Sequence, residues 1–360
     1  MTTTPPLATE TPAPSGATRL LLLFLLVFAL CCAAAMALPH STYIRFQQVA
    51  TSSMRPGVWI YERIEFDPAP IDVAIIGASR TETGISGPKL QAALSSRLGR
   101  PVGVANLSMP ADGRDLHYEI AKRLIRAHPE VKLILLSLTE HPSRTGHPAF
   151  RSLADTRDVL AGPKLINPGY LDDITYLPYR QLTLFAQSQA PSLFGVRSTF
   201  DPAAYWGTGY DSTQSYWSAN GRFVDRDAIL SPAVLADQAR GKVAQRTRVF
   251  LPPWARDYEY SIERHYTRAL DTLAREHGVQ IGFVYLPVYA HASQMGDRDF
   301  YAARGLVFDA SFLADRSDNY SDYAHLNRYG SERMTAWLAE RLGAMSERGQ
   351  VRLTREPAGE

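Results

Sequence analysis

The sequence predicts an α/β domain built on a parallel sheet and preceded by a helix that crosses a membrane. Two observations predict the domain: several apolar runs are too short for buried helices, and amphipathic helical patterns separate them. The third observation is a run of 19 residues without a charge, at 20–38. Continuous apolar strands between amphipathic helices are typical of a parallel sheet that helices cover on both faces.

Composition places the chain among ordinary globular proteins and excludes several functions. Of its 360 residues, 45% are hydrophobic and 21% charged, and this length allows one large domain or two modest ones. The 38 lysines and arginines nearly balance the 36 aspartates and glutamates, which argues against a dedicated nucleic-acid binder. The two cysteines, Cys31 and Cys32, lie in the uncharged run, so the rest of the chain offers no disulfide framework, cysteine-ligated zinc site or cysteine nucleophile.

The uncharged run Leu20–Leu38 is long enough to span a membrane, because a helix rises about 1.5 Å per residue and the hydrocarbon core is roughly 30 Å thick. We expect a disordered cytoplasmic tail at 1–18 and a transmembrane signal anchor at 19–38, in the inner membrane. A cleaved secretory signal is the alternative, since Ala35-Met36-Ala37 fits a small-x-small cleavage site. Basic residues flank both ends of the run and do not decide its orientation. Either interpretation exports the remaining chain, so the domain is expected on the periplasmic side.

After a connector at 39–70, the domain begins with a repeated strand–helix pattern. The first strand is followed by a helix that Ser86 caps, with Pro88 in its first turn, and that ends at Gly99. The next helix ends before Pro129. The strands of this half are expected at Ile71–Gly77, Val102–Leu107 and Val131–Leu138.

An insertion at 142–256 interrupts this pattern, which then resumes to the end of the domain. A helix closed by Gly278 leads into a fourth strand at Ile281–Leu286. The last helix carries an apolar stripe that includes Met334 and Leu342. We expect the α/β domain to span 71–346, with a disordered tail at 347–360.

The residues that follow each strand are the candidates for a site, because parallel sheets place their sites at the carboxyl ends of the strands. Ser79 follows the first strand, in the turn Gly77-Ala78-Ser79-Arg80-Thr81, where its hydroxyl is exposed and its N–H is placed to stabilise negative charge. An ordinary turn serine, or a glycine turn that binds phosphate, is the alternative. The second strand ends in the loop Asn106–Gly113, whose small residues let the backbone approach the serine, unless it is a generic connection.

A third feature, Asp322-Tyr323-Ala324-His325-Leu326-Asn327, stands directly before the last helix. An aspartate three residues before a histidine can orient the imidazole while the other ring nitrogen faces a substrate. The alternative is purely structural, with Asp322 holding the loop and Asn327 capping the helix.

Taken together, GASRT around Ser79, the loop NLSMPADG and the segment SDYAHLN resemble the SGNH/GDSL hydrolase superfamily over about 71–141 and 280–345. The GASRT form and the membrane segment look most like the envelope branch that includes DltD-like and polysaccharide O-acetylation proteins. The resemblance implies a flavodoxin-like three-layer sheet, with Ser79 as nucleophile, His325 as general base and Asp322 as its orienting partner. It also implies an oxyanion hole made by the N–H of Ser79 and one from the second loop, where Ala111 matches the family's glycine and Gly113 is the other candidate.

The sequence departs from this family after the third strand. The family has Gly-x-Asn-Asp there, and its asparagine donates to the oxyanion, whereas this chain has Thr139 and Glu140. An ionised Glu140 would repel an oxyanion, and the Thr139 hydroxyl could donate instead. Because the loss of one donor costs roughly 2.7–4 kcal/mol in other enzymes, three possibilities stay open: another donor, a slower transferase, or a catalytically silent member.

The insertion and the site's surroundings suggest a carbohydrate substrate. The insertion is rich in aromatic residues, as in Tyr205–Tyr210 and Tyr216-Trp217, which either stack on sugar rings or pack the insertion onto the sheet. An insertion of this length is often a lid, so we expect it to roof the serine. Arg80 and Arg114 could hold an anionic group or lie at the surface, and Asn106 is a further candidate for substrate binding. Histidine spacing and glycine motifs indicate neither a metal site nor a nucleotide cofactor.

The leading hypothesis is a membrane-anchored periplasmic esterase or O-acyltransferase that acts on an envelope or exported polysaccharide through an acyl-enzyme on Ser79. Its expected partners are the inner membrane, through residues 20–38, an acylated envelope substrate and, as the resemblance leaves open, a membrane acyl-donor protein. A catalytically silent binding or assembly component of a polysaccharide modification or export complex is the alternative. A phosphate or nucleotide binder that uses the first turn is a third.

Overall fold

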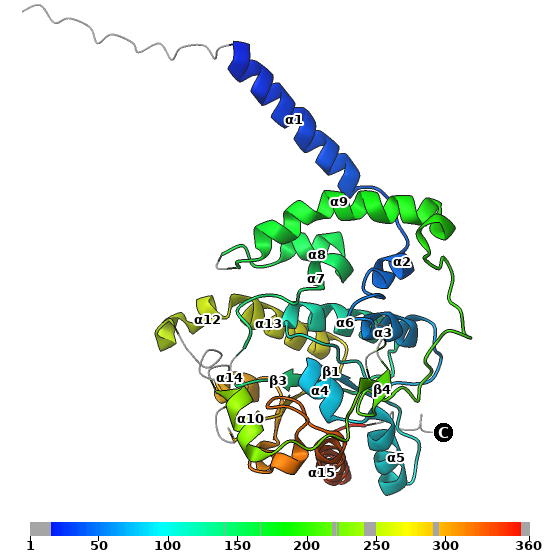
Figure 1. The fold of residues 1–360 in the computed structure, drawn as a ribbon, viewed down its shortest axis with the longest axis vertical. Helices are drawn as coiled ribbons and strands as arrows, with labels where there is room; N and C mark the ends of the chain where they lie inside the picture. Colours follow the sequence, from blue (N-terminus) through cyan, green and yellow to red (C-terminus); the bar gives the residue numbers. More distant parts are fainter. Residues whose placement is uncertain are drawn as a thin grey trace, which may run out of the picture.

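The computed structural model describes residues 16–353 except 141, 166, 218–220, 222, 241–249 and 291–294. Figure 1 shows a helix, α1 (Gly16–Met36), that projects from an α/β body. Its side chains are almost all exposed, and it is long and apolar enough to cross a membrane. The helix begins three residues before the predicted segment 19–38, so it includes positions 16–18 of the predicted tail. The rest of that tail, 1–15, lies outside the described residues.

The body is built on a five-stranded parallel sheet with the order β2-β1-β3-β6-β7. The strands are β1 (Val73–Ile76), β2 (Val104–Asn106), β3 (Leu133–Leu138), β6 (Gln280–Tyr285) and β7 (Leu306–Asp309). The first four confirm the predicted strands within a few residues. The fifth was not predicted, because it is four residues long and only Phe308 in it is buried.

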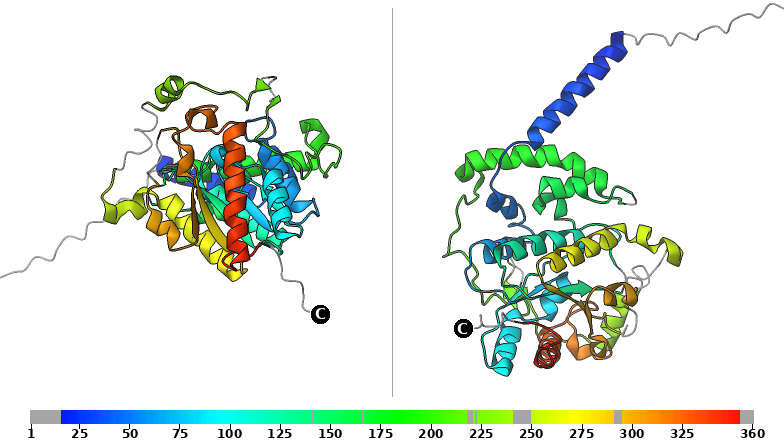
Figure 2. Two further views of the ribbon diagram at one scale, coloured as in Figure 1. Left: turned by 90° about the horizontal axis from the view of Figure 1, so that it is seen from below. Right: turned by 180° about the vertical axis from the view of Figure 1, so that it is seen from behind.

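Helices cover both faces of this sheet (Figures 1 and 2). Alternate strand residues such as Ala74 and Ile134 pack with α3 (Pro56–Glu65), α6 (Arg114–Ala127) and α13 (Ser261–Glu276). Their neighbours Val73 and Leu133 pack on the other face with α5 (Gly87–Leu98) and α15 (Arg328–Glu347). The side-chain period of two along each strand therefore supplies two separate cores.

The predicted helix signals of α5 are confirmed. The Ser86 hydroxyl accepts a hydrogen bond from the Lys89 N–H at 3.3 Å, and Gly99 closes the helix in the left-handed conformation, with φ at 63°. The side chain of Asn327 caps α15 in the same way, by accepting from the Gly330 N–H at 2.9 Å. The capping role considered for Asn327 is thus present.

Two stretches outside the predicted domain belong to the packed body. The predicted connector 39–70 forms α2 (Thr42–Gln47) and α3, which bury residues such as Phe46 and Trp59 against the sheet side of α6. The predicted disordered tail at 347–360 is corrected over 347–353, because α15 runs to Glu347 and the side chains of Val351 and Leu353 are buried. Residues 354–360 lie outside the described residues.

The insertion 142–256 divides into two parts. The first part, on the α1 side of the body, holds α7 (Phe150–Leu153), α8 (Thr156–Ala161), α9 (Tyr170–Gln189) and η1 (Pro191–Phe194). The second part holds the hairpin β4 (Tyr216–Trp217) and β5 (Phe223–Val224), α10 (Pro232–Ala239) and η2 (Pro253–Ala255). The remaining short elements are α4 (Ser79–Gly84), α12 (Arg256–Glu259), α14 (Arg298–Ala302), η3 (Ser311–Leu313) and η4 (Ser317–Asn319).

Candidate active site

Ser79 is the first residue of α4, directly after the turn that leaves β1. The turn lies unusually close to β3: a Cβ added at Gly77 would stand 2.6 Å from the Ser137 Cβ. Only glycine fits this approach. The Ala78 N–H donates to the Ser137 hydroxyl at 3.3 Å and so ties the turn to β3. This close contact places Ser79 at the carboxyl edge of the sheet, as predicted.

His325 and Asp322 lie in the loop before α15. The Asp322 Oδ1 accepts hydrogen bonds from the N–H groups of Ala324 at 2.8 Å and His325 at 2.9 Å, which fixes the carboxylate within its own loop. Both carboxylate oxygens also contact the His325 Nδ1, at 3.0 and 2.8 Å. Asp322 therefore both shapes the loop and orients the imidazole ring.

The structure brings the two predicted segments together: the His325 Nε2 lies 2.8 Å from the Ser79 Oγ. This distance is within the roughly 2.6–3.2 Å expected of a nucleophile and its base. Burial alone would raise the pKa of Asp322, but its contacts with His325 and two backbone N–H groups lower it to about 2. An ionised Asp322 keeps the proton of the neutral ring on Nδ1, so that Nε2 is free to accept the hydroxyl proton of Ser79.

A cavity of about 600 Å³ lies on one side of Ser79, and we call it the oxyanion cavity. Its lining includes Ala78, Ala111 and Thr139. Ala111, predicted to stand where the family has glycine, has a φ of 73°, in the left-handed region that favours glycine. Among the described residues, neither the Ser79 N–H nor the Ala111 N–H donates a hydrogen bond. These two groups are therefore the candidates for binding an oxyanion.

Gly113, the other predicted oxyanion residue, has a packing role. Its φ of 171° is extended backbone that any residue adopts. A Cβ there would stand 2.1 Å from the backbone nitrogen of His147, so glycine is needed for the close approach of that segment. Asn106 is also structural: its Nδ2 donates to the carbonyls of Thr81 at 3.0 Å and Ile85 at 2.7 Å. The prediction that Asn106 binds substrate or oxyanion is therefore corrected.

Glu140 and Arg80 form a buried ion pair in the wall of the oxyanion cavity. The Arg80 Nη1 donates to both Glu140 carboxylate oxygens, at 2.8 and 2.9 Å, and the Val288 N–H adds a third bond to Glu140 at 3.2 Å. Burial alone would raise the pKa of Glu140, but Arg80 and the backbone donors hold it below its ordinary value. The expected repulsion of an oxyanion by Glu140 is thus offset by an adjacent cation. The Arg80 Nη1 is engaged by Glu140, whereas its buried Nη2 has no hydrogen-bond partner among the described residues, so a role for Arg80 in binding an anionic group stays a prediction.

Arg114 is likewise engaged inside the protein. It is buried, and its guanidinium donates to the Ser137 carbonyl at 2.8 Å and to Glu263 at 2.9 Å. Arg114 therefore holds the end of β3 through the Ser137 carbonyl, and its role is structural.

Ser79 also lines a second cavity, of about 700 Å³, which we call the histidine groove because His325 and Asp322 line it. Of the residues that the structure describes, Ser79 alone lines both cavities. Hydroxyl side chains contribute much of the groove's wall: Thr51, Ser52, Ser53, Thr83 and Ser321. The β4–β5 hairpin of the insertion supplies another wall with Tyr216, Phe223 and Arg226. Two parts of the insertion therefore border Ser79: this hairpin at the histidine groove and the segment 142–148 at the oxyanion cavity. Helices α7–α9 lie on the α1 side.

Glu82 is the residue of this site that sequence reasoning missed. It lies one turn after Ser79 on α4, lines the histidine groove and is 7% exposed. No described residue hydrogen-bonds to its carboxyl group. Burial raises its pKa to about 8, although the charge of Arg226 acts in the opposite direction, so the neutral acid predominates at pH 7. The spacing of three residues from Ser79 on one helix was the signal available in the sequence.

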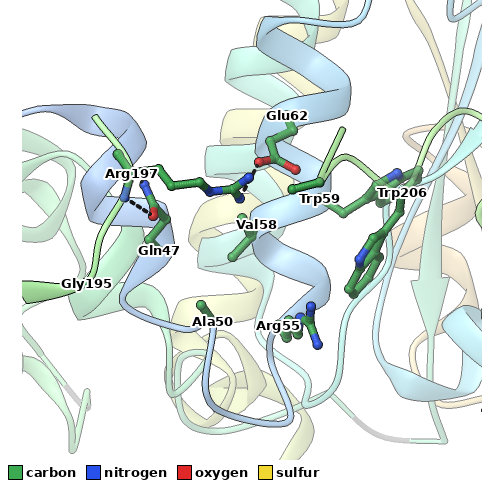
Figure 3. Close-up of a pocket in the computed structure, with 10 residues that line it drawn as sticks. Gln47, Ala50, Arg55, Val58, Trp59, Glu62, Gly195, Arg197 and Trp206 are labelled. Carbon is green, nitrogen blue, oxygen red and sulfur yellow. Dashed lines mark hydrogen bonds and ion pairs between the residues drawn. The ribbon is translucent and has the colours of Figure 1, made fainter. Parts of the chain in front are cut away.

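The aromatic residues at Tyr205–Tyr210 were considered either for stacking on sugar or for packing. The two tyrosines are partly buried against the core, while Trp206 is 36% exposed. Tyr210 lies between Trp59 and Trp206, with ring centroids 4.8 and 4.7 Å away, and the Tyr205 hydroxyl donates to Asp67 at 2.6 Å. Trp206 lines a separate cavity of about 290 Å³, shown in Figure 3, which shares no lining residue with the two cavities at Ser79. The packing role therefore holds for Tyr205 and Tyr210, while Trp206 is exposed at the wall of this separate cavity.

One acidic cluster, Glu119, Asp155 and Asp158, has the proximity of metal ligands. Lys122 contacts all three carboxylates, and Arg45 and Arg123 add further ion pairs with Asp155. These cations already compensate the negative charge of the cluster, so it is explained as an ion-pair network.

Comparison of the chain with protein-family models finds no match, and comparison with curated proteins finds none either.

Proposed function

We propose that this protein is a membrane-anchored serine ester hydrolase or O-acyltransferase of the SGNH type. The observation that carries the proposal is the 2.8 Å contact between Ser79 Oγ and His325 Nε2, with Asp322 on the other ring nitrogen. The strand order β2-β1-β3-β6-β7 supports it, because it corresponds to the flavodoxin-like order with the serine at the end of the first strand. The left-handed conformation of Ala111 adds support at the second loop.

The chemistry that follows is a two-step acyl transfer. His325 Nε2 takes the hydroxyl proton of Ser79 while Oγ attacks the acyl carbonyl, and the N–H groups of Ser79 and Ala111 stabilise the oxyanion. The C–O bond to the alcohol then breaks, and His325 returns its proton to the leaving oxygen. In the second step His325 deprotonates water or an acceptor hydroxyl, which attacks the acyl-enzyme and frees Ser79.

The histidine groove is proposed to bind the alcohol part of the substrate, because the leaving and the attacking oxygens must both reach His325. Its hydroxyl side chains, the neutral acid Glu82 and the cation Arg226 can bond to a polyhydroxylated molecule, and Tyr216 can lie against a sugar ring. These features support an envelope or exported polysaccharide as the acylated or accepting substrate.

We further propose that α1 anchors the protein in the inner membrane, with the tail before it in the cytoplasm and the α/β body in the periplasm. The length and the exposed apolar surface of α1 support the anchor. A membrane protein that delivers the acyl group to Ser79 is the proposed donor partner for the transferase.

Labelling of the full chain with a fluorophosphonate tests the proposal. We expect the wild-type protein and a Ser53→Ala control, which removes another groove hydroxyl, to be labelled. Ser79→Ala should abolish labelling, and His325→Ala should slow it strongly. The Ser79→Ala variant should lose ester cleavage and acyl transfer together with the label. Labelling of this variant equal to that of the wild type would refute the role of Ser79 as nucleophile.

One observation favours a second candidate, a silent binding or assembly component: the family's asparagine donor is replaced by Thr139 and the paired Glu140. This candidate predicts that Ser79→Ala restores the phenotype of a deletion strain as well as the wild-type gene does. The enzyme predicts that it does not.

A further inference from the structure

Helix α9 lies across the base of α1 and is the outermost element of the body on that side (Figures 1 and 2). Two hydrogen bonds fix the chain at this junction. The buried Gln181 of α9 donates to the carbonyl of Met36, the last residue of α1, at 3.2 Å, and the Ser41 N–H donates to the Ser188 hydroxyl at 3.0 Å. The position of α9 relative to the exit of α1 is therefore part of the fold.

The inner face of α9 is anchored to the body. Leu177 and Leu184 are buried on this face, and the Arg180 guanidinium donates to the carbonyls of Arg151 at 2.7 Å and Ala154 at 2.9 Å. These contacts determine which side of the helix points away from the protein.

The outer face of α9 is apolar and exposed. Leu171, Tyr179 and Leu182 are 75%, 63% and 53% exposed, and their spacing places them on one stripe, together with Thr175 and Ala186. The stripe continues beyond the helix into η1, where Leu193 is 83% and Phe194 49% exposed. At 1.5 Å per residue the helix alone gives this surface a length of about 30 Å.

Charge is absent from this stripe and appears only at its margin. Within α9, which the structure describes completely, Asp172 and Asp173 stand at the N-terminal end, and Asp172 is paired with Arg151. A contiguous exposed apolar surface on an otherwise well-packed protein marks an interaction site. Its position beside the exit of a helix able to span a membrane identifies lipid as the occupant.

We propose that the outer face of α9, with Leu171, Tyr179, Leu182, Leu193 and Phe194, lies in the boundary between headgroups and acyl chains of the membrane that α1 spans. The helix then runs parallel to the bilayer surface, with its leucines in contact with the acyl chains and the Tyr179 hydroxyl near the headgroups. The proposal rests on α1 being a membrane anchor, as proposed above, but not on the chemistry of Ser79.

The test uses the full chain with Cys31→Ala and Cys32→Ala, so that a single cysteine can be introduced and labelled with the fluorophore NBD. Leu182→Cys and Leu193→Cys probe the apolar face, and neither substitution touches the core. Phe312→Cys is the control, because Phe312 is 49% exposed and packs on Trp337 of α15, on the far side of the sheet. Each protein is reconstituted in phosphatidylcholine–phosphatidylglycerol vesicles with and without spin-labelled lipid.

We expect lipid with the spin label near the headgroup to remove most of the NBD emission at 182 and 193 and little at 312. Aqueous iodide should quench in the opposite order. Equal responses at all three positions, in protein that floats with the vesicles, would overturn the proposal while leaving the anchor intact. If the labels at 182 and 193 are protected from iodide only at high protein density, and spin-labelled lipid does not quench them, a second copy of the chain covers this face. That result would overturn the proposal. Failure to float would refute both the anchor and the membrane-facing surface.

Discussion

The buried acid Glu82 gives the sharpest energetic prediction, through the substitution Glu82→Gln. Glutamine matches the shape of the protonated acid but cannot ionise. In the folded protein the pKa of Glu82 is raised to about 8 by burial, against 4.5 in the unfolded chain. The native state therefore binds a proton more tightly than the unfolded state, and the wild-type protein loses stability as the pH rises from about 4.5 to about 8.

The magnitude follows from the same two values. The difference between about 8 and 4.5 is about 3.5, which corresponds to at most about 5 kcal/mol at roughly 1.36 kcal/mol per pH unit. Because Glu82 borders an open groove, where water can reach part of the carboxylate, we expect about 2–5 kcal/mol at pH 9. At pH 5 the two proteins should differ little, since both carry a neutral side chain.

Urea unfolding of the full chain in detergent, followed by tryptophan fluorescence at pH 5, 7 and 9, measures this difference. Other groups that titrate in this range, such as Asp115, with a pKa raised to about 7 by burial, are common to both proteins and cancel. Glu276→Gln, at an exposed position of α13, is the matched control and should show no growing difference. A free-energy difference between wild type and Glu82→Gln that stays constant from pH 5 to pH 9 would refute a buried neutral acid.

Three further substitutions test the site. Asp322→Asn should slow fluorophosphonate labelling of Ser79 by up to about 10⁴-fold, the effect of the equivalent change in a serine protease, with little loss of thermal stability; an unchanged labelling rate would contradict the orienting role. Arg80→Met should cost about 3–5 kcal/mol of unfolding free energy, because it leaves Glu140 buried without its cation, and adding Glu140→Gln should recover part of that loss in the same urea titration. Gly77→Ala should displace the turn that carries Ser79 and reduce labelling. Ser137→Gly in the same protein should restore labelling only in part, since the added Cβ clashes with the side chains of both Ser137 and Thr81.

Local patterns were sufficient to predict most of the fold. The apolar runs of β1, β3 and β6 are continuous because both faces of these strands are buried, and the caps at Ser86 and Gly99 mark a helix within one residue. The edge strand β7 was missed for the opposite reason: it is short and only partly buried, so its sequence carries little apolar signal. The helices of 39–70 were missed because they are short and because charged residues interrupt the apolar pattern of α3. These residues form ion pairs within the fold, as Arg63 does with Asp67.

The candidate site was predictable where chemistry is local and unpredictable where it depends on distant contacts. Asp322 and His325 are three positions apart, and the loop that holds them uses bonds within the same segment. The pairing of Arg80 with Glu140 joins residues 60 positions apart, and it could not be read from either segment alone. The pKa of Glu82 likewise depends on its burial in the folded chain and on the charge of Arg226, which is 144 positions away in the sequence.

Ser79 is the one residue of the described chain that lines both cavities, and under the proposed acyl transfer this placement bears on the fate of the acyl group. If the proposed acyl group on the Ser79 oxygen lies in the oxyanion cavity, the released alcohol can leave the histidine groove and another can bind there without displacing it. Under the proposed function, water and hydroxyl-bearing acceptors would then compete for the acyl group within the histidine groove.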